Sequence, residues 1–418
     1  MDLMKVYEVV GGELNNFDNI IINKIKTNSK EVNKNDLFLA INKGHDYIEE
    51  AINNGASAII VEKETNYKIP TIKVESTILA LGKLASYIRS LYNIPLIAIT
   101  GSTGKTTTKE LVSLILSSKY KVLKSVENKN NHIGLPLTLL NLDDTYDLVV
   151  LELGMNHLNE IDYLSKICKP DCAIITNIGT AHIGNLGSKK NILKAKMEII
   201  NGMDNGLLVL NGYDKLLRKV KYKNSIKVNK RNFKIKKLKY CKNHIEFKID
   251  NILFKFNNTF KHIFIDLLIS IKMGMLFNVS LKDISNTILN YNSIGGRLSV
   301  TDNKYRIIDD SYNSSYESLI GGLKHIKKYK NFKIIILGDM LELGKYSIKY
   351  HKKINKYLKK IKNKEVLLIG EYTKYIGGIH FNNIDDINNY LKNNLKDNSI
   401  IYIKGSRSMN LDKIIIKK

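Results

Sequence analysis

The chain has 418 residues, 44% of them apolar, so it is too long for one ordinary core and apolar enough to build two or three domains. Its formal net charge of +26 comes from many lysines and only six arginines, whereas proteins that read nucleic acid usually place arginine forks or aromatic side chains at defined positions. Three cysteines exclude a disulfide framework, and the longest apolar helical stretch, residues 263–277, contains charges and falls short of a membrane span.

The first ninety residues alternate short strands and helices. The pattern predicts strands at 37–41 and 58–61 and helices at 47–54 and 76–92. Gly55 stands where a C-terminal helix cap is expected. With a boundary just before Pro95, the alternation predicts a small α/β domain over residues 1–93.

A glycine-rich turn follows an apolar strand predicted at residues 94–100. The text from Ala98 reads AITGSTGKTTT, which joins a buried parallel strand to a helix beginning near Lys105. Backbone N–H groups in such a turn bind phosphates, and the Lys105 ammonium reaches the β- and γ-phosphates. Thr106 or Thr107 would then ligate Mg²⁺. The residues expected to bind ATP here are Gly101, Ser102, Thr103, Gly104, Lys105, Thr106 and Thr107.

Residues 94–292 continue to alternate, which predicts a central domain with a doubly wound parallel sheet and a P-loop. Polar side chains stand where its strands end, the edge at which such sheets bind ligands. Glu152 has the position of a second Mg²⁺ ligand, or of a buried structural glutamate. His182 is either a metal or phosphate contact or an ordinary loop residue. Donors for a phosphate or a carboxylate substrate, or plain turn residues, are Asn128, Asn130 and Asn131.

The run 215–243 is strongly basic and holds no acidic residue. Its alternating pattern predicts exposed β-hairpins, whose lysines form either a solvated face or a surface for an anionic partner. An amphipathic helix is expected at 263–277. Residues 293–418 then repeat the helix and strand alternation, with strands at 306–309, 333–337, 365–369 and 399–403, which predicts a Rossmann-like third domain.

At this point the sequence resembles the Mur ligases, ATP-dependent amide-bond ligases of cell-wall synthesis, and within them the MurF type. The resemblance covers essentially the whole chain through TNSKEVNKNDLFLAI, GSTGKTTTKE, NKNNHIGLPLT, LELGMN, TNIGTAHIGNLGS, AKMEI, GGR, DDSYNSS, LGDMLELG and KGSRSM. It implies a cytoplasmic enzyme of peptidoglycan precursor synthesis that adds D-alanyl-D-alanine to UDP-N-acetylmuramoyl-tripeptide through an acyl phosphate. The absence of a signal-peptide segment also favours the cytoplasm.

The resemblance also implies roles for individual residues. Lys105 and Thr106 would hold the triphosphate and a first Mg²⁺, with Glu152 as partner ligand, and His182 would serve a second metal. Lys196 matches a lysine that CO₂ carbamylates to give a metal-binding carboxylate. Nucleotide contacts from the third domain would come from Arg297, Asp310 and Asn313, and substrate contacts from Ser29, His45, Asn128, Asn130, Asn131, Ser406 and Arg407.

The sequence departs from the family pattern at several places. Lys30 replaces an arginine, the loop before His45 is short, Asp266 stands where an asparagine contacts adenine, and 314–316 read Ser-Ser-Tyr. Diaminopimelate and lysine both stay open as the third residue of the tripeptide. The alternatives are another Mur or folylpolyglutamate-type ligase, or a basic P-loop protein that binds nucleic acid. We expect a monomer with no specific nucleic-acid partner and no membrane insertion.

Overall fold

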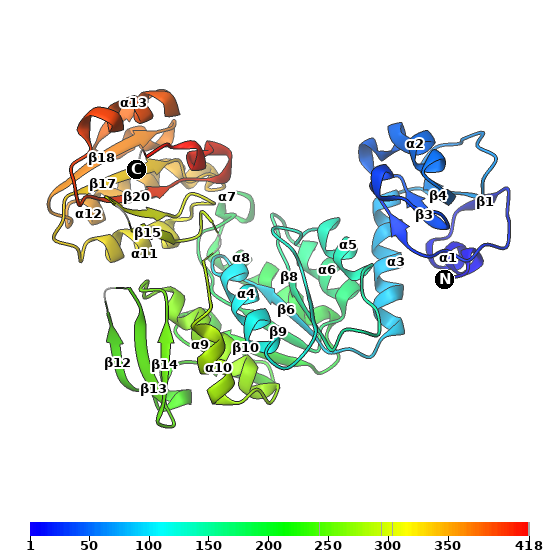
Figure 1. Cartoon of the computed structure of the whole chain (residues 1–418), viewed down its shortest axis with the longest axis horizontal. Coiled ribbons are helices and arrows are strands. Elements are labelled where there is room, and N and C mark those ends of the chain that lie inside the picture. The colour runs from blue at the N-terminus through cyan, green and yellow to red at the C-terminus, as the bar shows by residue number, and fades with distance from the viewer. Residues whose placement is uncertain (242, 294, 303, 417–418) are drawn as a thin grey trace.

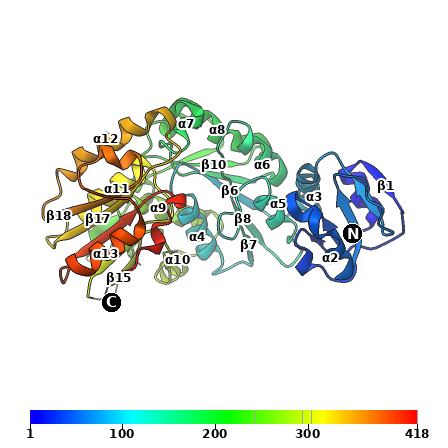
Figure 2. The ribbon, with the colours of Figure 1, turned by 90° about the horizontal axis from the view of Figure 1, so that it is seen from above.

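The computed structural model describes residues 1–416 apart from 242, 294 and 303, and arranges them as three lobes (Figure 1). The amino-terminal lobe lies at one end, the central sheet in the middle and the carboxy-terminal lobe at the other end, and the view in Figure 2 agrees. Each lobe is built on a mostly parallel sheet. The predicted α/β class is therefore confirmed.

The amino-terminal lobe is a five-stranded sheet in the order β1-β5-β4-β3-β2, with only β1 antiparallel to its neighbour. A short 3-10 helix at Asn42–Tyr47 precedes α2, where the sequence predicts one helix from 47. Its elements are α1 (Leu3–Val10), β1 (Glu13–Asn15), β2 (Ile25–Lys26), β3 (Asp36–Leu39), α2 (Ile48–Asn53), β4 (Ala56–Val61) and β5 (Thr71–Lys73).

A single helix, α3 (Thr77–Leu91), joins this lobe to the central one. Its first half packs Leu81 and Leu84 into the amino-terminal core. Near its other end, the buried Arg89 donates to the Cys168 carbonyl at 3.0 Å and pairs with Asp171 at 3.1 Å. The helix is therefore fixed to both lobes.

The central sheet has six parallel strands in the order β11-β10-β9-β6-β8-β7, with helices on both faces. Covered on both sides, β6 is buried along its whole length, as its run of apolar residues predicts. The elements are β6 (Leu96–Thr100), α4 (Lys105–Leu116), β7 (Val122–Lys124), α5 (Gly134–Leu139), β8 (Leu148–Glu152), α6 (Glu160–Cys168), β9 (Cys172–Ile175), α7 (Ile183–Leu186), α8 (Lys189–Met197), β10 (Leu207–Asn211) and β11 (Ser225–Val228).

An antiparallel sheet of β12 (Lys236–Tyr240), β13 (Ile245–Ile249) and β14 (Ile252–Phe256) follows, then α9 (Ile263–Leu276) and α10 (Leu281–Ile288). The hairpins are not simply exposed, because Phe247 and Phe254 are buried while the lysines of β12 face solvent. Lys242 of the basic run lies outside the described residues. The prediction of an amphipathic α9 is wrong: it packs against α4 and the β10 and β11 edge, and most of its residues are buried.

The carboxy-terminal sheet has the order β15-β16-β20-β17-β18-β19, with only β15 antiparallel. Its elements are β15 (Ser299–Asp302), β16 (Arg306–Asp309), α11 (Tyr316–Ile326), β17 (Lys333–Gly338), α12 (Ser347–Leu358), β18 (Lys364–Ile369), β19 (Ile379–Phe381), α13 (Ile384–Asn394) and β20 (Ile400–Lys404). The predicted strand bounds are correct to within a residue. In the part of the chain that the structure describes, no helix is long and apolar enough to cross a membrane.

Candidate active site

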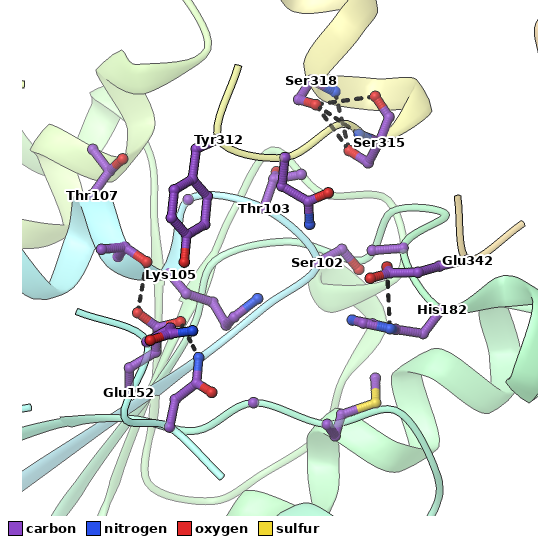
Figure 3. Close-up of a pocket in the computed structure, with 18 of the residues that line it drawn as sticks. Ser102, Thr103, Lys105, Thr107, Glu152, His182, Tyr312, Ser315, Ser318 and Glu342 are labelled. Atoms are coloured by element: carbon purple, nitrogen blue, oxygen red, sulfur yellow. Dashed lines mark hydrogen bonds and ion pairs between the residues drawn. The ribbon is translucent and has the colours of Figure 1, made fainter. Parts of the chain in front are cut away.

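A cavity of about 760 Å³ lies where β6 and β8 end and is closed on its other side by the carboxy-terminal lobe. Parallel strands end at one edge of a sheet, so loops far apart in sequence meet there. Figure 3 shows Lys105, Glu152, His182 and Glu342 around a common space. The predicted site residues that line the cavity are Ser102, Thr103, Gly104, Lys105, Thr106, Thr107, Asn128, Asn130, Asn131, Glu152, His182, Arg297, Asp310 and Asn313.

The turn between β6 and α4 requires two glycines. Gly101 and Gly104 have φ angles of 157° and 78°, in the region that favours glycine. A Cβ at Gly101 would lie 1.8 Å from Oγ1 of Thr176, and one at Gly104 would lie 2.6 Å from Oδ2 of Asp266. Both glycines are therefore fixed by space as well as by backbone conformation.

Oxygen atoms suited to a divalent cation meet at the start of α4. The Thr106 hydroxyl donates to Oε2 of Glu152 at 2.7 Å, and the Asn130 amide donates to Oε1 of the same carboxylate at 2.8 Å. The backbone N–H of Glu152 donates to the Ser125 hydroxyl at 3.1 Å. Hydroxyl and carboxylate oxygens are the ligands that Mg²⁺ prefers, so this donor set fits the ion. The Lys105 ammonium donates to the Gly101 carbonyl at 3.1 Å.

His182 is held as a neutral imidazole. Its backbone is left-handed, with φ 62°, and its Nδ1 lies 3.2 Å from Oε2 of Glu342. Burial, reinforced by the nearby ammonium groups of Lys105 and Lys196, lowers the pKa of His182 to about 3. Burial also raises the pKa of Glu342. A neutral imidazole keeps a lone pair for a metal ion.

Lys196, on α8, is buried but does not line the cavity. No ion pair of its ammonium occurs among the described residues. Burial, together with the positive charge of Lys105, lowers the pKa of Lys196 well below its ordinary value, although the Glu152 carboxylate counteracts this in part. A buried amine with a lowered pKa is neutral more often, and the neutral amine is the form that reacts with CO₂.

Asp266, on α9, is a buried carboxyl on the cavity wall beside Gly104. Burial raises the pKa of Asp266 well above its ordinary value, and the neighbouring Thr108 hydroxyl offsets this only in part. The proton is therefore held more tightly than on an exposed aspartate.

The carboxy-terminal lobe contributes a buried ion pair. The Lys404 ammonium donates to Oδ2 of Asp310 at 2.7 Å and to the Asn313 carbonyl at 2.9 Å, and the Tyr402 hydroxyl donates to the same Asp310 oxygen at 3.0 Å. Burial nevertheless raises the pKa of Asp310, although Lys404 opposes it. Asp310 and Asn313 thus have fixed positions before any ligand arrives.

Two predicted substrate residues lie in the amino-terminal lobe, away from the cavity. The Ser29 hydroxyl donates to Glu50 at 2.6 Å. Nε2 of His45 accepts the Glu62 N–H at 3.1 Å, and Nδ1 lies 3.0 Å from the Asn42 carbonyl. Both side chains already have protein partners.

Two more predicted residues, Ser406 and Arg407, do not line the cavity. The Ser406 hydroxyl accepts the Leu341 N–H at 2.9 Å. Arg407 is exposed and pairs with Asp412 at 3.1 Å, and its guanidinium lies 5.8 Å from the centroid of the Tyr312 ring. Arg297 stacks on the same ring at 3.7 Å from its centroid, and both Arg297 and Tyr312 line the cavity.

Several residues of the site have no role in the sequence-based predictions. Asn177, Glu342 and Lys404 belong to the motifs TNIGTAH, LGDMLELG and KGSRSM, so the motifs mark these positions but do not indicate what the side chains do. Tyr312 lies in DDSYN. Glu317 lines the cavity and belongs to no such motif.

Three family models match the chain: "Mur ligase family, catalytic domain" over residues 21–89, "Mur ligase middle domain" over 99–280 and "Mur ligase, glutamate ligase domain" over 296–407. A UDP-N-acetylmuramoyl-tripeptide--D-alanyl-D-alanine ligase from Buchnera aphidicola subsp. Baizongia pistaciae is 35% identical to the chain. The match covers 99% of this chain and 97% of the relative.

Two solved structures are similar over nearly the whole chain. MurF from Acinetobacter baumannii superposes with a TM-score of 0.90 at 26% identity, covering 98% of this chain and 97% of that one. MurF ligase from Thermotoga maritima in complex with ADP gives a TM-score of 0.85 at 27% identity, and the match covers 95% of this chain and 97% of that one.

Proposed function

The chain belongs to the Mur ligase family of ATP-dependent amide-bond-forming enzymes, and from that premise we propose that it joins D-alanyl-D-alanine to UDP-N-acetylmuramoyl-tripeptide. The observation that carries the proposal is the single cavity in which a phosphate-binding loop of the central lobe faces Asp310 and Asn313 of the carboxy-terminal lobe. The relative from Buchnera has that activity in its name, and it matches the chain from end to end.

The reaction activates a carboxylate, which is a poor electrophile. An oxygen of the tripeptide's terminal carboxylate attacks the γ-phosphorus, the bond to ADP breaks, and an acyl phosphate forms. The amine of D-alanyl-D-alanine then attacks the acyl carbon, phosphate leaves, and the nitrogen loses a proton. Lys105 and the N–H groups of the 101–104 turn would neutralise and orient the phosphates, and closure of the cavity would exclude water from the acyl phosphate.

Mg²⁺ fits the oxygen set of Thr106 and Glu152, and a second ion fits the neutral His182. When bound, such ions neutralise charge on the phosphate oxygens. Lys196 has a buried amine that forms no ion pair among the described residues, as carbamylation needs, and as a carbamate it would supply a further carboxylate. Burial and the Lys105 ammonium lower its pKa, and the Glu152 carboxylate raises it.

The remaining assignments belong to the same proposal. The domain of residues 1–93 would bind the UDP-sugar, and the domain of residues 94–292 would bind ATP. The domain of residues 293–418, of which 294, 303 and the last two residues lie outside the described part, would contact the nucleotide from the opposite side of the cavity. Asn128, Asn130 and Asn131 would bind substrate, and so would Ser29, His45, Ser406 and Arg407 after a change of partners. The enzyme would act as a cytoplasmic monomer without a specific nucleic-acid partner.

The test measures phosphate release from ATP and Mg²⁺ with UDP-N-acetylmuramoyl-tripeptide, with and without D-alanyl-D-alanine. Two tripeptides, one with diaminopimelate and one with lysine, would determine the third residue. We expect release that requires both substrates, yields the pentapeptide by mass, and collapses in Lys196→Ala but not in Lys194→Ala, an exposed lysine of the same helix. Release that is independent of D-alanyl-D-alanine would reject the acceptor.

A further inference from the structure

We propose that Glu317, on the first turn of α11, is a positioning residue that makes the geometry of the phosphate loop and of His182 depend on docking of the carboxy-terminal lobe. The inference rests on the proposed function, because it concerns the same cavity. It assigns a role to a residue outside the recognised motifs.

Glu317 makes three polar contacts with the central lobe. Its Oε2 accepts two hydrogen bonds from Thr180, one from the backbone N–H and one from the hydroxyl, both at 2.8 Å. Its Oε1 lies 2.9 Å from the ammonium of Lys189 at the start of α8. One carboxylate of the carboxy-terminal lobe therefore holds the loop that follows β9.

That loop is also bound to the phosphate loop. The Gly179 N–H donates to the Ser102 hydroxyl at 2.8 Å, and the Thr103 N–H donates to Oδ1 of Asn177 at 3.0 Å. Asn177 in turn donates its amide to the Thr103 carbonyl at 3.0 Å and to its hydroxyl at 2.7 Å. Figure 3 shows Ser102 and Thr103 on the same side of the cavity as His182.

The short segment 177–182 is thus bound to the phosphate loop on one side and to the carboxy-terminal lobe on the other. Asn177 binds the phosphate loop, Thr180 binds Glu317, and His182 follows two residues later. Gly179 allows this close approach, because a Cβ there would lie 2.8 Å from Oε2 of Glu317 and 3.1 Å from Cβ of Ser102. A shift of Glu317 would move the segment that carries both contacts.

The position of Glu317 is itself well determined. Ser315 caps α11, its hydroxyl accepting the Ser318 N–H at 3.4 Å, and the Ser318 hydroxyl donates to the Ser315 carbonyl at 3.0 Å. A carboxylate on the first turn is also favoured by the helix dipole. These two serines lie together in Figure 3, on the opposite side of the cavity from Glu152.

Another contact between the same lobes provides a matched control. The Tyr346 hydroxyl donates to the Gly187 carbonyl at 2.8 Å, beyond α7 and away from the phosphate loop. Loss of this bond would weaken docking without releasing residues 177–182. A residue that only holds the lobes together and a residue that positions the loop can therefore be distinguished.

The experiment compares Glu317→Ala, Glu317→Gln and Tyr346→Phe in the full chain. Hydrogen bonds to charged groups are strong, so we expect Glu317→Ala to lower kcat by about 10- to 100-fold. The equilibrium Kd for ADP should change less than about twofold, because the hydrogen bonds that join the phosphate loop to Asn177 and Gly179 remain in the variant and a small shift of the loop affects the rate more than binding. Glu317→Gln, which keeps one oxygen for the Thr180 N–H, should recover part of kcat, and Tyr346→Phe should stay within about threefold of the native kcat.

Hydrogen exchange at the Thr180 amide gives a readout that needs no substrate. Faster exchange in Glu317→Ala than in Tyr346→Phe supports the positioning role, even if the ligase assay finds a different acceptor. Equal losses of kcat in Glu317→Ala and Tyr346→Phe would overturn it, as would an unchanged Thr180 exchange rate. If the native chain released phosphate without D-alanyl-D-alanine, the acceptor assignment would fail while the exchange result would still decide the role of Glu317.

Discussion

The two walls of the cavity are built differently. The central wall is held by hydrogen bonds within one lobe, such as those that join Thr106 and Asn130 to Glu152. The carboxy-terminal wall has its own buried ion pair between Lys404 and Asp310, and it meets the central wall through side chains such as Glu317 and Glu342. Under the proposed function, the central wall would supply the chemistry and the carboxy-terminal wall would decide when the chemistry can proceed.

The largest expected effect concerns the inside of the carboxy-terminal wall. Lys404→Met leaves the Asp310 carboxylate buried without its cation, which should destabilise this lobe by about 3–5 kcal/mol. Chemical denaturation measures the loss, and Lys404→Met with Asp310→Asn should recover much of it. A Lys404→Met variant that unfolds at the native denaturant midpoint would contradict this expectation.

Next in size is removal of Lys105, the lysine proposed to bind phosphate. Lys105→Met should lower kcat by roughly 10²–10³-fold, the effect of deleting one preorganised donor to developing charge. Its thermal midpoint should stay near native, since within the described part of the chain the Lys105 ammonium donates only to the Gly101 carbonyl. Lys194→Met is the control for loss of a lysine. A variant that melts early would mean that the central wall needs Lys105 for folding.

Acid should weaken the central wall through His182. The pKa of His182 in the folded state is about 3, against about 6.5 when unfolded, so the unfolded chain binds this proton first as the pH falls. The stabilisation is complete above pH 6.5 and is lost between 6.5 and 3. Between pH 7.5 and 5.5 it should decline by about 1.4 kcal/mol. Between the two pH values, the free energy of unfolding of His182→Gln should decline by about 1.4 kcal/mol less than that of the native chain, as chemical denaturation measures. An equal decline in the two proteins would mean that His182 is protonated in the folded protein.

The smallest effect is expected at Asp266. Its pKa is raised in the folded state, so its contribution to stability is lost as the pH rises above the unfolded value. Asp266→Asn should therefore raise the thermal midpoint by roughly 2–4 °C at pH 7, the shift for about 1 kcal/mol, and by less at pH 4. Melting curves at the two pH values test this. A lower midpoint at pH 7 would show that the carboxylate is stabilised by contacts with the ionised form.

The strands and the phosphate loop could be predicted because their signals are local. Buried parallel strands such as β6 and β8 have apolar runs, and the glycines of the 101–104 turn are needed for backbone reasons that act within a few residues. The family, the α/β class and the amide-bond-forming activity of the family are confirmed, while phosphate binding by this turn stays a prediction.

Contacts between distant parts of the chain could not be predicted in this way. Glu317 and Thr180 are 137 residues apart, and no periodicity in either segment indicates their hydrogen bonds. The burial of α9 could not be predicted for the same reason. The sequence shows that the helix is apolar, but it does not show which elements pack on its different sides. The partners of Ser29 and His45 likewise depend on how the amino-terminal lobe packs.

The continuous helix α3 sets a distance. Its 15 residues span about 22 Å at the α-helical rise, and Arg89 fixes its far end to the central lobe. Because α3 also packs against α5 and α6 of the central lobe, its length and its rotation together set how the amino-terminal lobe is placed beside the central one. One residue inserted into α3 would lengthen it by about 1.5 Å and turn the amino-terminal lobe by about 100° relative to the central lobe.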